Sequence, residues 1–283
     1  MSPSGISIAP MDSQHLTEAR ALSEAESWPH RIEDWDFMLA LGRGAVALDG
    51  DQVVGTIMWW PNGESHSTLG MVIVKRERQG QGLGQRLMEE ALAEIGERQI
   101  TLNATEEGMR LYAKLDFEKI DVVVQHQGRP TLPDAGSESD ETSVRPMRQD
   151  DLPAIFALDA EETGRPREAM LQALERAGKG LVAERDGQLR GYALARPFGY
   201  GHVIGPVVAE DDRLARTFVR TWIERLGDGF VRIDVRAASD LSDWLAAHGL
   251  RKVDEGVTMA RGGAPDDRQP SPRLFALASQ ALG

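Results

Sequence analysis

The strongest chemical signal in the sequence is a glycine-rich segment, Arg78-Gln79-Gly80-Gln81-Gly82-Leu83-Gly84. It follows an apolar, β-branched run that ends at Val74, and it opens a segment whose apolar residues have helical spacing. Glycine allows tight turns and a close approach of the backbone to a ligand. The first turn of a helix adds free N–H groups and a partial positive charge. The segment therefore favours binding of an anion such as a pyrophosphate. The cations around it are Lys75, Arg76, Arg78 and Arg86.

Two other nucleotide-binding patterns do not fit this segment. A phosphate-binding loop of the NTPase type needs Gly-Lys-Ser/Thr after four spacers, and that triplet is absent. A dinucleotide-binding fold needs the glycines after the first strand, whereas here they follow the fourth predicted strand. Taken alone, the glycines also fit a flexible, solvated turn.

The elements that must position this segment can be predicted from periodicity and turn signals. Their order is β-α-α-β-β-β-α-β-α-β, which indicates a sheet flanked by helices and an α/β or α+β fold class. The predicted strands are 6–10, 44–48, 52–60, 68–74, 100–104 and 117–124, and the predicted helices are 12–27, 31–41, 82–96 and 107–115.

The sequence repeats itself at a nearly constant offset, which predicts two copies of one fold. The matching segments are Ile6–Met11 with Thr142–Met147, Asp51–Pro61 with Gly187–Pro197, and Leu69–Val74 with Ile204–Ala209. We therefore expect a first copy at residues 1–128, a linker rich in Pro, Gly, Ser and acid at 129–142, and a second copy at 143–261. A C-terminal tail with a short helix is expected at 262–283.

Composition narrows the function classes. The chain has 283 residues, a net charge of −13 and no cysteine. Disulfides, thiolate metal sites and cysteine nucleophiles are excluded, and we expect no metal cofactor. The acidic balance argues against nucleic acid as a partner. No apolar run approaches the roughly 18–20 residues of a membrane span, and the N-terminus has no leader pattern, so we expect a cytoplasmic protein without membrane association.

The motif Gln79-x-x-Gly82-x-Gly84, between a strand and a helix, resembles the acetyl-coenzyme A signature of the GNAT superfamily of N-acetyltransferases. The stretch Leu102–Phe117 resembles the later motif of that family, in which a Tyr precedes a Leu-Gly-Phe turn. Asp116 replaces the usual Gly, and Asp tolerates left-handed backbone conformations. The resemblance covers nearly all of the first copy, and the second copy resembles a divergent GNAT domain. It implies two tandem GNAT-like domains, each with a mixed, mostly antiparallel sheet flanked by helices.

The resemblance also implies acetyl-CoA as co-substrate and a set of site residues. Loop N–H groups would bind the pyrophosphate, and the preceding strand would separate from its neighbour and hold the pantetheine and the thioester carbonyl. The cofactor-binding residues would be Val72, Ile73, Val74, Gln79, Gly80, Gln81, Gly82, Leu83 and Gly84. Tyr112 would protonate the leaving thiolate, and Asn103 would hold a water or the cofactor amide. The base is open among His30, His66, Glu106, Glu107 and a water chain.

Aromatic residues of the first copy are candidates for the acceptor pocket, because aromatic faces can enclose an aliphatic or cationic amine. The candidates are Trp28, His30, Trp35 and Trp59, and the alternative is that the tryptophans are simply core. Trp59 and Trp60 are neighbours on a strand, so they should point to opposite faces.

The second copy carries Glu210-Asp211-Asp212 in place of the glycine loop and Leu245 in place of Tyr112. Three carboxylates would repel a pyrophosphate, although they can cap a helix. We therefore expect one catalytic copy, which transfers acetyl directly from acetyl-CoA to the primary amine of a small molecule, and we allow for a homodimer. The alternatives are a non-catalytic acyl-CoA-binding sensor and a protein N-acetyltransferase.

Overall fold

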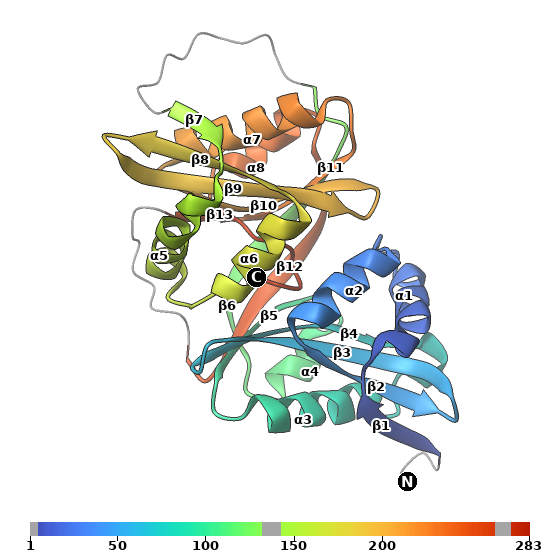
Figure 1. The fold of residues 1–283 in the computed structure, drawn as a ribbon. Coiled ribbons are helices and arrows are strands. Elements are labelled where there is room, and N and C mark those ends of the chain that lie inside the picture. Colours follow the sequence, from blue (N-terminus) through green and yellow to red (C-terminus); the bar gives the residue numbers. More distant parts are fainter. Residues whose placement is uncertain (1–4, 132–142, 264–272) are drawn as a thin grey trace.

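The computed structural model describes residues 5–131, 143–263 and 273–283 (Figure 1). The first copy contains β1 (Ile6–Pro10), α1 (Leu16–Ala25), α2 (Ile32–Leu41), β2 (Arg43–Asp49), β3 (Gln52–Asn62), β4 (His66–Val74), α3 (Leu83–Ile95), β5 (Gln99–Ala104), α4 (Met109–Ala113) and β6 (Glu118–Gly128). Short 3-10 turns η1 (Ser13–His15) and η2 (Arg76–Arg78) precede α1 and α3. This is the element order that the sequence predicts.

The second copy repeats the same order. It contains β7 (Ser143–Pro146), η3 (Gln149–Asp151), α5 (Leu152–Thr163), α6 (Glu168–Ala177), β8 (Lys179–Arg185), β9 (Gln188–Phe198), β10 (Gly201–Ala209), α7 (Asp212–Leu226), β11 (Val231–Arg236), α8 (Leu241–Ala247) and β12 (Arg251–Arg261). Of the expected linker, residues 132–142 lie outside the described residues.

The strands of both copies form one 13-stranded sheet in the order β1-β2-β3-β4-β5-β12-β6-β11-β13-β10-β9-β8-β7. The sixth strands of the two copies are exchanged. β12 of the second copy lies between β5 and β6 of the first, while β6 lies against β11 of the second. Most pairings are antiparallel, with β4–β5 and β10–β11 as the parallel pairs among the described residues.

The tail corrects one expectation. Its described part forms a strand, β13 (Arg273–Ala276), followed by turns, where the sequence reading expected a short helix. β13 pairs with β10 on one side and with β11 on the other. Four residues are too few for helical periodicity to decide their structure, and here two open strand edges provide the hydrogen-bond partners of β13.

The helices bury three apolar clusters against the sheet. One cluster lies under α3 and α4, a second under α7 and α8, and a third joins α1, α2, α5 and α6 of both copies. Figure 1 shows α1 and α2 facing α5 and α6 across the middle of the molecule, with the C-terminus between them. This third cluster includes Ala278 and Leu282 of the tail. The two copies therefore share a core as well as a sheet.

The strand exchange predicts that neither copy folds without the other. In the described part of the chain, β6 pairs with strands of the second copy, β11 and β12, so a fragment of residues 1–131 leaves β6 without a ladder partner. We expect fragments 1–131 and 143–283 to copurify when co-expressed and to unfold in one cooperative transition, and each to lack such a transition when expressed by itself. Thermal unfolding followed by circular dichroism measures this. A folded monomeric 1–131 fragment would contradict the exchange.

Candidate active site

The glycine loop leads into α3 as the sequence predicts. Gly80 and Gly82 have left-handed φ angles of 73° and 80°, and a β-carbon at either would meet nothing within 4 Å. Gly82 is the N-cap of α3 and supplies no side-chain hydrogen bond to the helix. The first-turn N–H groups of α3 are thus free of a side-chain cap, and the helix start can accept an anion.

The cations around the loop are mostly engaged within the first copy. Arg78 pairs with Asp49, the Nε of Arg76 lies 3.4 Å from Glu26, and Arg86 donates to the Ile6 carbonyl over 2.9 Å. Arg76 and Arg78 keep 71% and 40% of their side chains exposed, so both can turn toward an incoming anion. The ammonium group of Lys75 makes no hydrogen bond or ion pair with the described residues.

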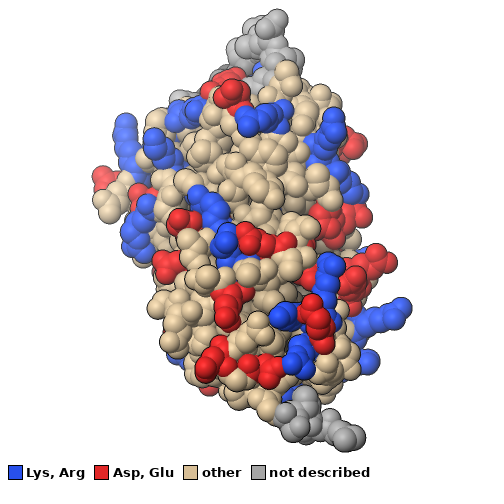
Figure 2. All heavy atoms as spheres, turned by 90° about the vertical axis from the view of Figure 1, so that its right-hand side faces the viewer, with Lys and Arg blue, Asp and Glu red and all other residues tan. Residues whose placement is uncertain are grey.

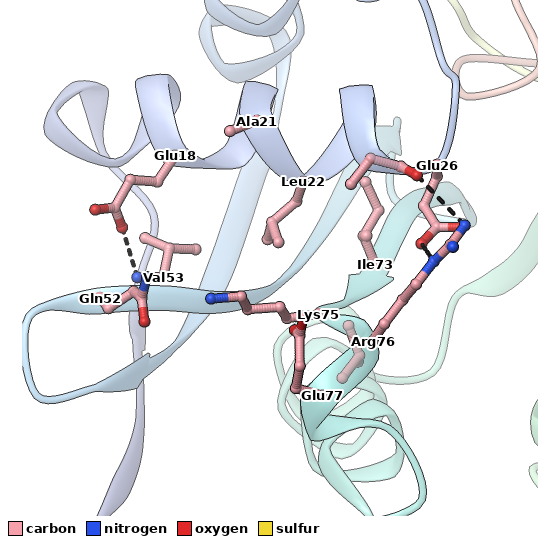
Figure 3. A pocket seen from close by; sticks show the side chains of 12 residues that line it. Glu18, Ala21, Leu22, Glu26, Gln52, Val53, Ile73, Lys75, Arg76 and Glu77 are labelled. Carbon is pink, nitrogen blue, oxygen red and sulfur yellow. Dashed lines mark hydrogen bonds and ion pairs between the residues drawn. The ribbon is translucent and has the colours of Figure 1, made fainter.

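An open pocket of about 240 Å³ lies beside the loop, between α1 and the ends of β3 and β4. Figure 3 shows Lys75 extending across it below Leu22, with its ammonium group directed toward Gln52 and Val53. Glu18 holds the Val53 N–H at 2.6 Å on one side. Sequence reasoning missed this pocket, because its lining comes from segments that are far apart along the chain.

The strand before the loop separates from its parallel neighbour. β4 pairs with β5 from His66 to Leu69, and no pairing continues beyond Leu69 and Leu102. We call the stretch beyond, Gly70–Val74 of β4 opposite Asn103–Ala104 of β5, the fork. The β4 edge that faces the fork thus has no strand partner in the described residues, and its backbone groups are available to an extended ligand.

A bulge in β4 accompanies the fork. Met71 adopts a φ of 54°, the register with β3 shifts at this point, and the Thr56 hydroxyl donates to the Met71 carbonyl over 2.8 Å. Among the expected cofactor residues of β4, Ile73 packs toward α1, while Val72 and Val74 pack on the α3 side. Gln79 donates to the Val74 carbonyl over 3.1 Å and so ties the loop to the open end of the fork.

Tyr112 lies on α4, on the α3 side of the sheet. Its ring makes an edge contact with Phe117 at 6.0 Å, and its side chain is buried. Burial raises the pKa of Tyr112 well above its ordinary value, so the hydroxyl stays protonated at neutral pH. Asp116 takes the left-handed conformation with φ 62° that the Tyr-containing turn requires. The hydroxyl is therefore a proton donor and not a base.

Asn103 is used differently from the sequence expectation. Its Nδ2 donates to the Gln280 carbonyl over 2.7 Å, and its Oδ1 accepts from the Thr258 hydroxyl over 2.7 Å. Both ends of the amide are occupied, so in this arrangement Asn103 holds the C-terminal tail and β12 and not a water or a cofactor amide.

Three of the four acceptor candidates lie together, with the rings of His30 and Trp35 6.3 Å apart, and Trp59 lies apart from them. Trp59 packs on the α3 side, whereas Trp60 points to the opposite face, where its Nε1 donates to the Met38 carbonyl over 2.9 Å. Trp35 is fully buried and donates to the Ser23 hydroxyl over 3.2 Å. Trp28 lies next to His30 at 6.1 Å. Trp35 and Trp59 are core residues, which was the alternative interpretation.

His30 is buried at the boundary between the copies. Its ring lies 5.2 Å from that of Phe198 in the second copy, and its Nδ1 has no hydrogen-bond partner in the described structure. Burial, with Arg232 and Arg196 nearby and opposed by Asp34, lowers the pKa of His30 to about 3. His30 is thus neutral at pH 7 and could accept a proton only at a large cost.

The other candidate bases lie outside the fork. His66 begins β4, at the end opposite to the loop, and its Nδ1 contacts the Ser65 hydroxyl at 2.8 Å. Glu106 and Glu107 are exposed in the turn after β5. Within the described residues, no group of three or more His, Asp or Glu side chains could hold a metal ion.

A buried ion-pair cluster that sequence reasoning missed joins the copies. Asp34 at the start of α2 accepts from Arg31 at 2.9 and 3.0 Å, from Arg196 at 3.4 Å and from the Gly199 N–H at 3.1 Å. Burial would raise the pKa of Asp34, but the hydrogen bonds from Arg31 outweigh it and hold the pKa below its ordinary value. Asp34 therefore stays ionised and fixes α2 against β9.

In the second copy the loop position is acidic and internally paired. Asp211 caps α7 by accepting from the Leu214 N–H over 2.8 Å. Glu210 binds Arg185 at 2.7 Å, and Asp212 binds Arg273 at 2.6 Å. Leu245, in the place of Tyr112, is fully buried. This copy has neither the free helix start nor the hydroxyl of the first.

The surface of the molecule carries both signs of charge. Figure 2 shows Lys and Arg side chains interspersed with Asp and Glu over the face that it presents, without a broad basic area. No helix in the described part of the chain is both long and apolar enough to cross a membrane.

The buried His30 predicts a specific pH dependence. Below about pH 6.5 the unfolded chain takes up a proton at this residue, while the folded chain does so only near pH 3. Stability is therefore lost as the pH falls from 6.5 toward 3, at about 1.4 kcal/mol per pH unit. We expect the free energy of unfolding of a His30→Gln variant, measured with urea, to rise progressively relative to that of the wild type as the pH falls from 7 to 4.5. If the stability of the two proteins changed with pH in the same way, this account would be contradicted.

Comparisons with known proteins agree with this architecture. Two family descriptions, each for an acetyltransferase (GNAT) domain, match residues 40–119 and 155–276. An uncharacterized N-acetyltransferase of Bacillus subtilis, YitH, is 28% identical over 278 residues, covering 95% of this chain and 96% of its own length.

Solved structures share the fold at low identity. A putative acetyltransferase from Pyrococcus horikoshii has a TM-score of 0.81 at 19% identity, with 100% of this chain and 98% of that one covered. A tandem GNAT protein from the clavulanic acid biosynthesis pathway has a TM-score of 0.63 at 16% identity, with 92% and 100% covered. The chain therefore belongs to the GNAT acetyltransferases, with two GNAT domains in tandem, and is an acyltransferase of that type.

Proposed function

We propose that the first copy binds acetyl-CoA and transfers its acetyl group directly to the primary amine of a small molecule. The observation that carries the proposal is the combination of an uncapped glycine start of α3 with the unpaired β4 edge that leads away from it. These features fit a cofactor with a pyrophosphate at one end and an extended, amide-containing arm. When bound, acetyl-CoA supplies the activated thioester.

The loop and β4 would each hold a different part of the cofactor. The N–H groups of Gln79–Gly84 would bind the pyrophosphate, with Lys75, Arg76 and Arg78 within the same region. The free backbone groups of Val72–Val74 would pair with the amides of the arm, as a strand would. A backbone N–H near the bulge at Met71 would polarise the thioester carbonyl, where negative charge develops during attack.

Tyr112 would act as the general acid. Its high pKa keeps the proton available, and a thiolate leaving group needs one. The chain has no cysteine that could carry an acyl-enzyme intermediate, which favours direct transfer. His30 is not suited as the base because its pKa is about 3, and a water chain is the more consistent route for the amine proton.

A small acceptor suits the closed surroundings of the fork. On the α1–α2 side, Gly70 lies against Ala281 of the tail and Thr101 accepts a hydrogen bond from Arg165 of the second copy at 3.0 Å. The second copy thus covers the part of the sheet where an extended peptide would need open space. This favours a small amine over a protein acceptor.

Transfer can be tested with acetyl-CoA and a panel of primary amines: an alkyl monoamine, a diamine, an amino sugar, an amino acid and an arylethylamine. A disulfide reagent reports the released CoA thiol without background, because the protein has no cysteine. We expect micromolar binding of acetyl-CoA by calorimetry and amine-dependent thiol release. Binding without turnover on any amine would favour the acyl-CoA sensor instead.

The two ends of α3 provide a matched pair of variants for the loop. Gly82 and Gly96 both have positive φ angles and open space around them, at the start and the end of the helix. An alanine at either position strains the backbone by about 1 kcal/mol or more. We expect Gly82→Ala to weaken acetyl-CoA binding at least tenfold and Gly96→Ala to leave it unchanged. If both variants lost the same amount of affinity for acetyl-CoA, the loop would have no direct role in binding it.

Tyr112→Phe tests the acid separately. We expect kcat to fall about 100-fold, the typical scale for a general acid, with little change in the KM for acetyl-CoA. The largely exposed Tyr200 gives the control, since Tyr200→Phe should keep full turnover. Full activity of Tyr112→Phe across the pH range would remove Tyr112 from the mechanism.

A further inference from the structure

The second copy also has a fork, and it is filled. β10 and β11 pair in parallel at His202–Val203 with Val231–Arg232, and the pairing ends there, as it ends between β4 and β5. Beyond that point β13 lies between them. Val208 and Ala209 of β10 pair with Leu274 and Arg273, and Val235 of β11 pairs with Ala276.

We propose that β13 permanently fills the second copy's fork, and that its position there places the last residues of the chain at the acceptor site of the first copy. These residues then form one wall of that site. The proposal rests on the proposed function, because it takes the first copy's fork as the place of the acetyl-CoA arm. The chain would then bind one acetyl-CoA, and the second copy would contribute to acceptor selection through the tail.

The charges at the two loops are reversed to match their occupants. In the first copy, the start of α3 offers free N–H groups and nearby cations, which suit an anionic pyrophosphate. In the second copy the corresponding segment is acidic, and Arg273 at the near end of β13 binds Asp212 at 2.6 Å. β13 therefore enters its fork with a cation at the loop end, where the cofactor would place its anion.

Backbone contacts hold β13 along its length. The Leu274 N–H donates to Glu162 of α5 over 2.6 Å, and the Leu277 N–H donates to the Asp234 carbonyl of β11 over 2.9 Å. Phe275 and Ala276 are almost completely buried. Gly205 of β10 lies so close to the Leu277 carbonyl that a β-carbon there would come within 1.9 Å of it. Such contacts are those of an added strand and not of a loosely lying tail.

After β13 the chain continues to the closed end of the first copy's fork. Gln280 accepts from Asn103, the first β5 residue beyond the last β4–β5 pair, over 2.7 Å. Ala281 lies 3.4 Å from a β-carbon built on Gly70, the first β4 residue beyond that pair. The Gly283 carbonyl accepts from Arg167 of the second copy over 2.9 Å. Gln280, Ala281 and Gly283 thus connect both copies at this point.

The closed end is where the reacting group must lie. An arm that is anchored at the loop and laid along β4 from Val74 to Gly70 covers about 13 Å, at roughly 3.3 Å per residue. Its far end then meets Gly70 and Asn103, which are the residues that the tail contacts. The tail therefore borders the volume that the acceptor must enter and limits what fits there.

Hydrogen–deuterium exchange separates this proposal from the proposed function. We expect saturating acetyl-CoA to protect the amides of residues 70–84 and to leave residues 205–215 unchanged, because the second fork is already filled. Calorimetry should give one acetyl-CoA per chain. Protection in both copies or a stoichiometry of two would overturn the proposal. No protection in the first copy would contradict the proposed function. The exchange rates of residues 207–209 would still show whether β13 is paired with β10.

A charge exchange at the loop tests the coupling. Arg273 is 41% exposed, so Arg273→Glu should leave the fold intact while it places like charges next to Asp212. We expect faster exchange at Val207–Ala209, an unchanged KM for acetyl-CoA and a KM at least fivefold higher for the amine that turns over best in the panel. Adding Asp212→Arg should restore both the slow exchange at Val207–Ala209 and the KM for the amine.

Lys252→Glu is the control, because Lys252 forms an exposed pair with Glu255 away from β13. It should change neither quantity. If Arg273→Glu accelerates exchange at β10 without raising the amine KM, the tail is not a wall of the acceptor site. If neither the exchange rate nor the amine KM changes, the pairing of β13 does not depend on the acidic loop. Either result overturns the proposal.

Discussion

The antiparallel pairing of β6 with β12 is the contact on which the rest of the molecule depends. Each of these strands belongs by sequence to one copy and lies beside the fifth strand of the other. The exchange joins two sheets into one and brings α1 and α2 against α5 and α6, where they share an apolar core. The buried Asp34 cluster then fixes the copies on the same side of the sheet. The orientation of the active copy relative to its partner is therefore set by backbone pairing and buried charge together.

The two copies show how one framework can serve two purposes. In both, a parallel pair of strands separates after a few residues and leaves two facing edges. Unpaired edges are a liability in a sheet unless something covers them. The first copy keeps its edge open beside an uncapped helix start, while the second covers its edge with the chain's own end. The loss of the glycine loop in the second copy is consistent with this, since an arginine needs carboxylates where a pyrophosphate needs N–H groups.

The local elements and the glycine loop could be predicted from the sequence, because periodicity and turn residues act over short distances. The Tyr-containing turn was also predictable, and Asp116 adopts the left-handed conformation that it needs. The pairing partner of each strand was not predictable: nothing in β12 marks it as a neighbour of β5, and the three apolar residues of β13 fit a helix or a strand equally well. Asn103 and Trp35 were assigned to the site by position, but their roles depend on the tail and on packing that only the tertiary structure provides.

The exchanged strands also determine which segment of the chain behaves as a transferable module. The sequence repeat suggests cutting the chain after β6, but that cut separates the first copy from the strand that completes its own sheet. A chimera that replaces the second copy with that of a relative therefore has to carry a β12 that matches β5 and β6, and a tail that matches Gly70 and Asn103. Recombination between relatives at the repeat boundary is for this reason constrained by compatibility across the joint, and the two halves are expected to diverge as a matched pair.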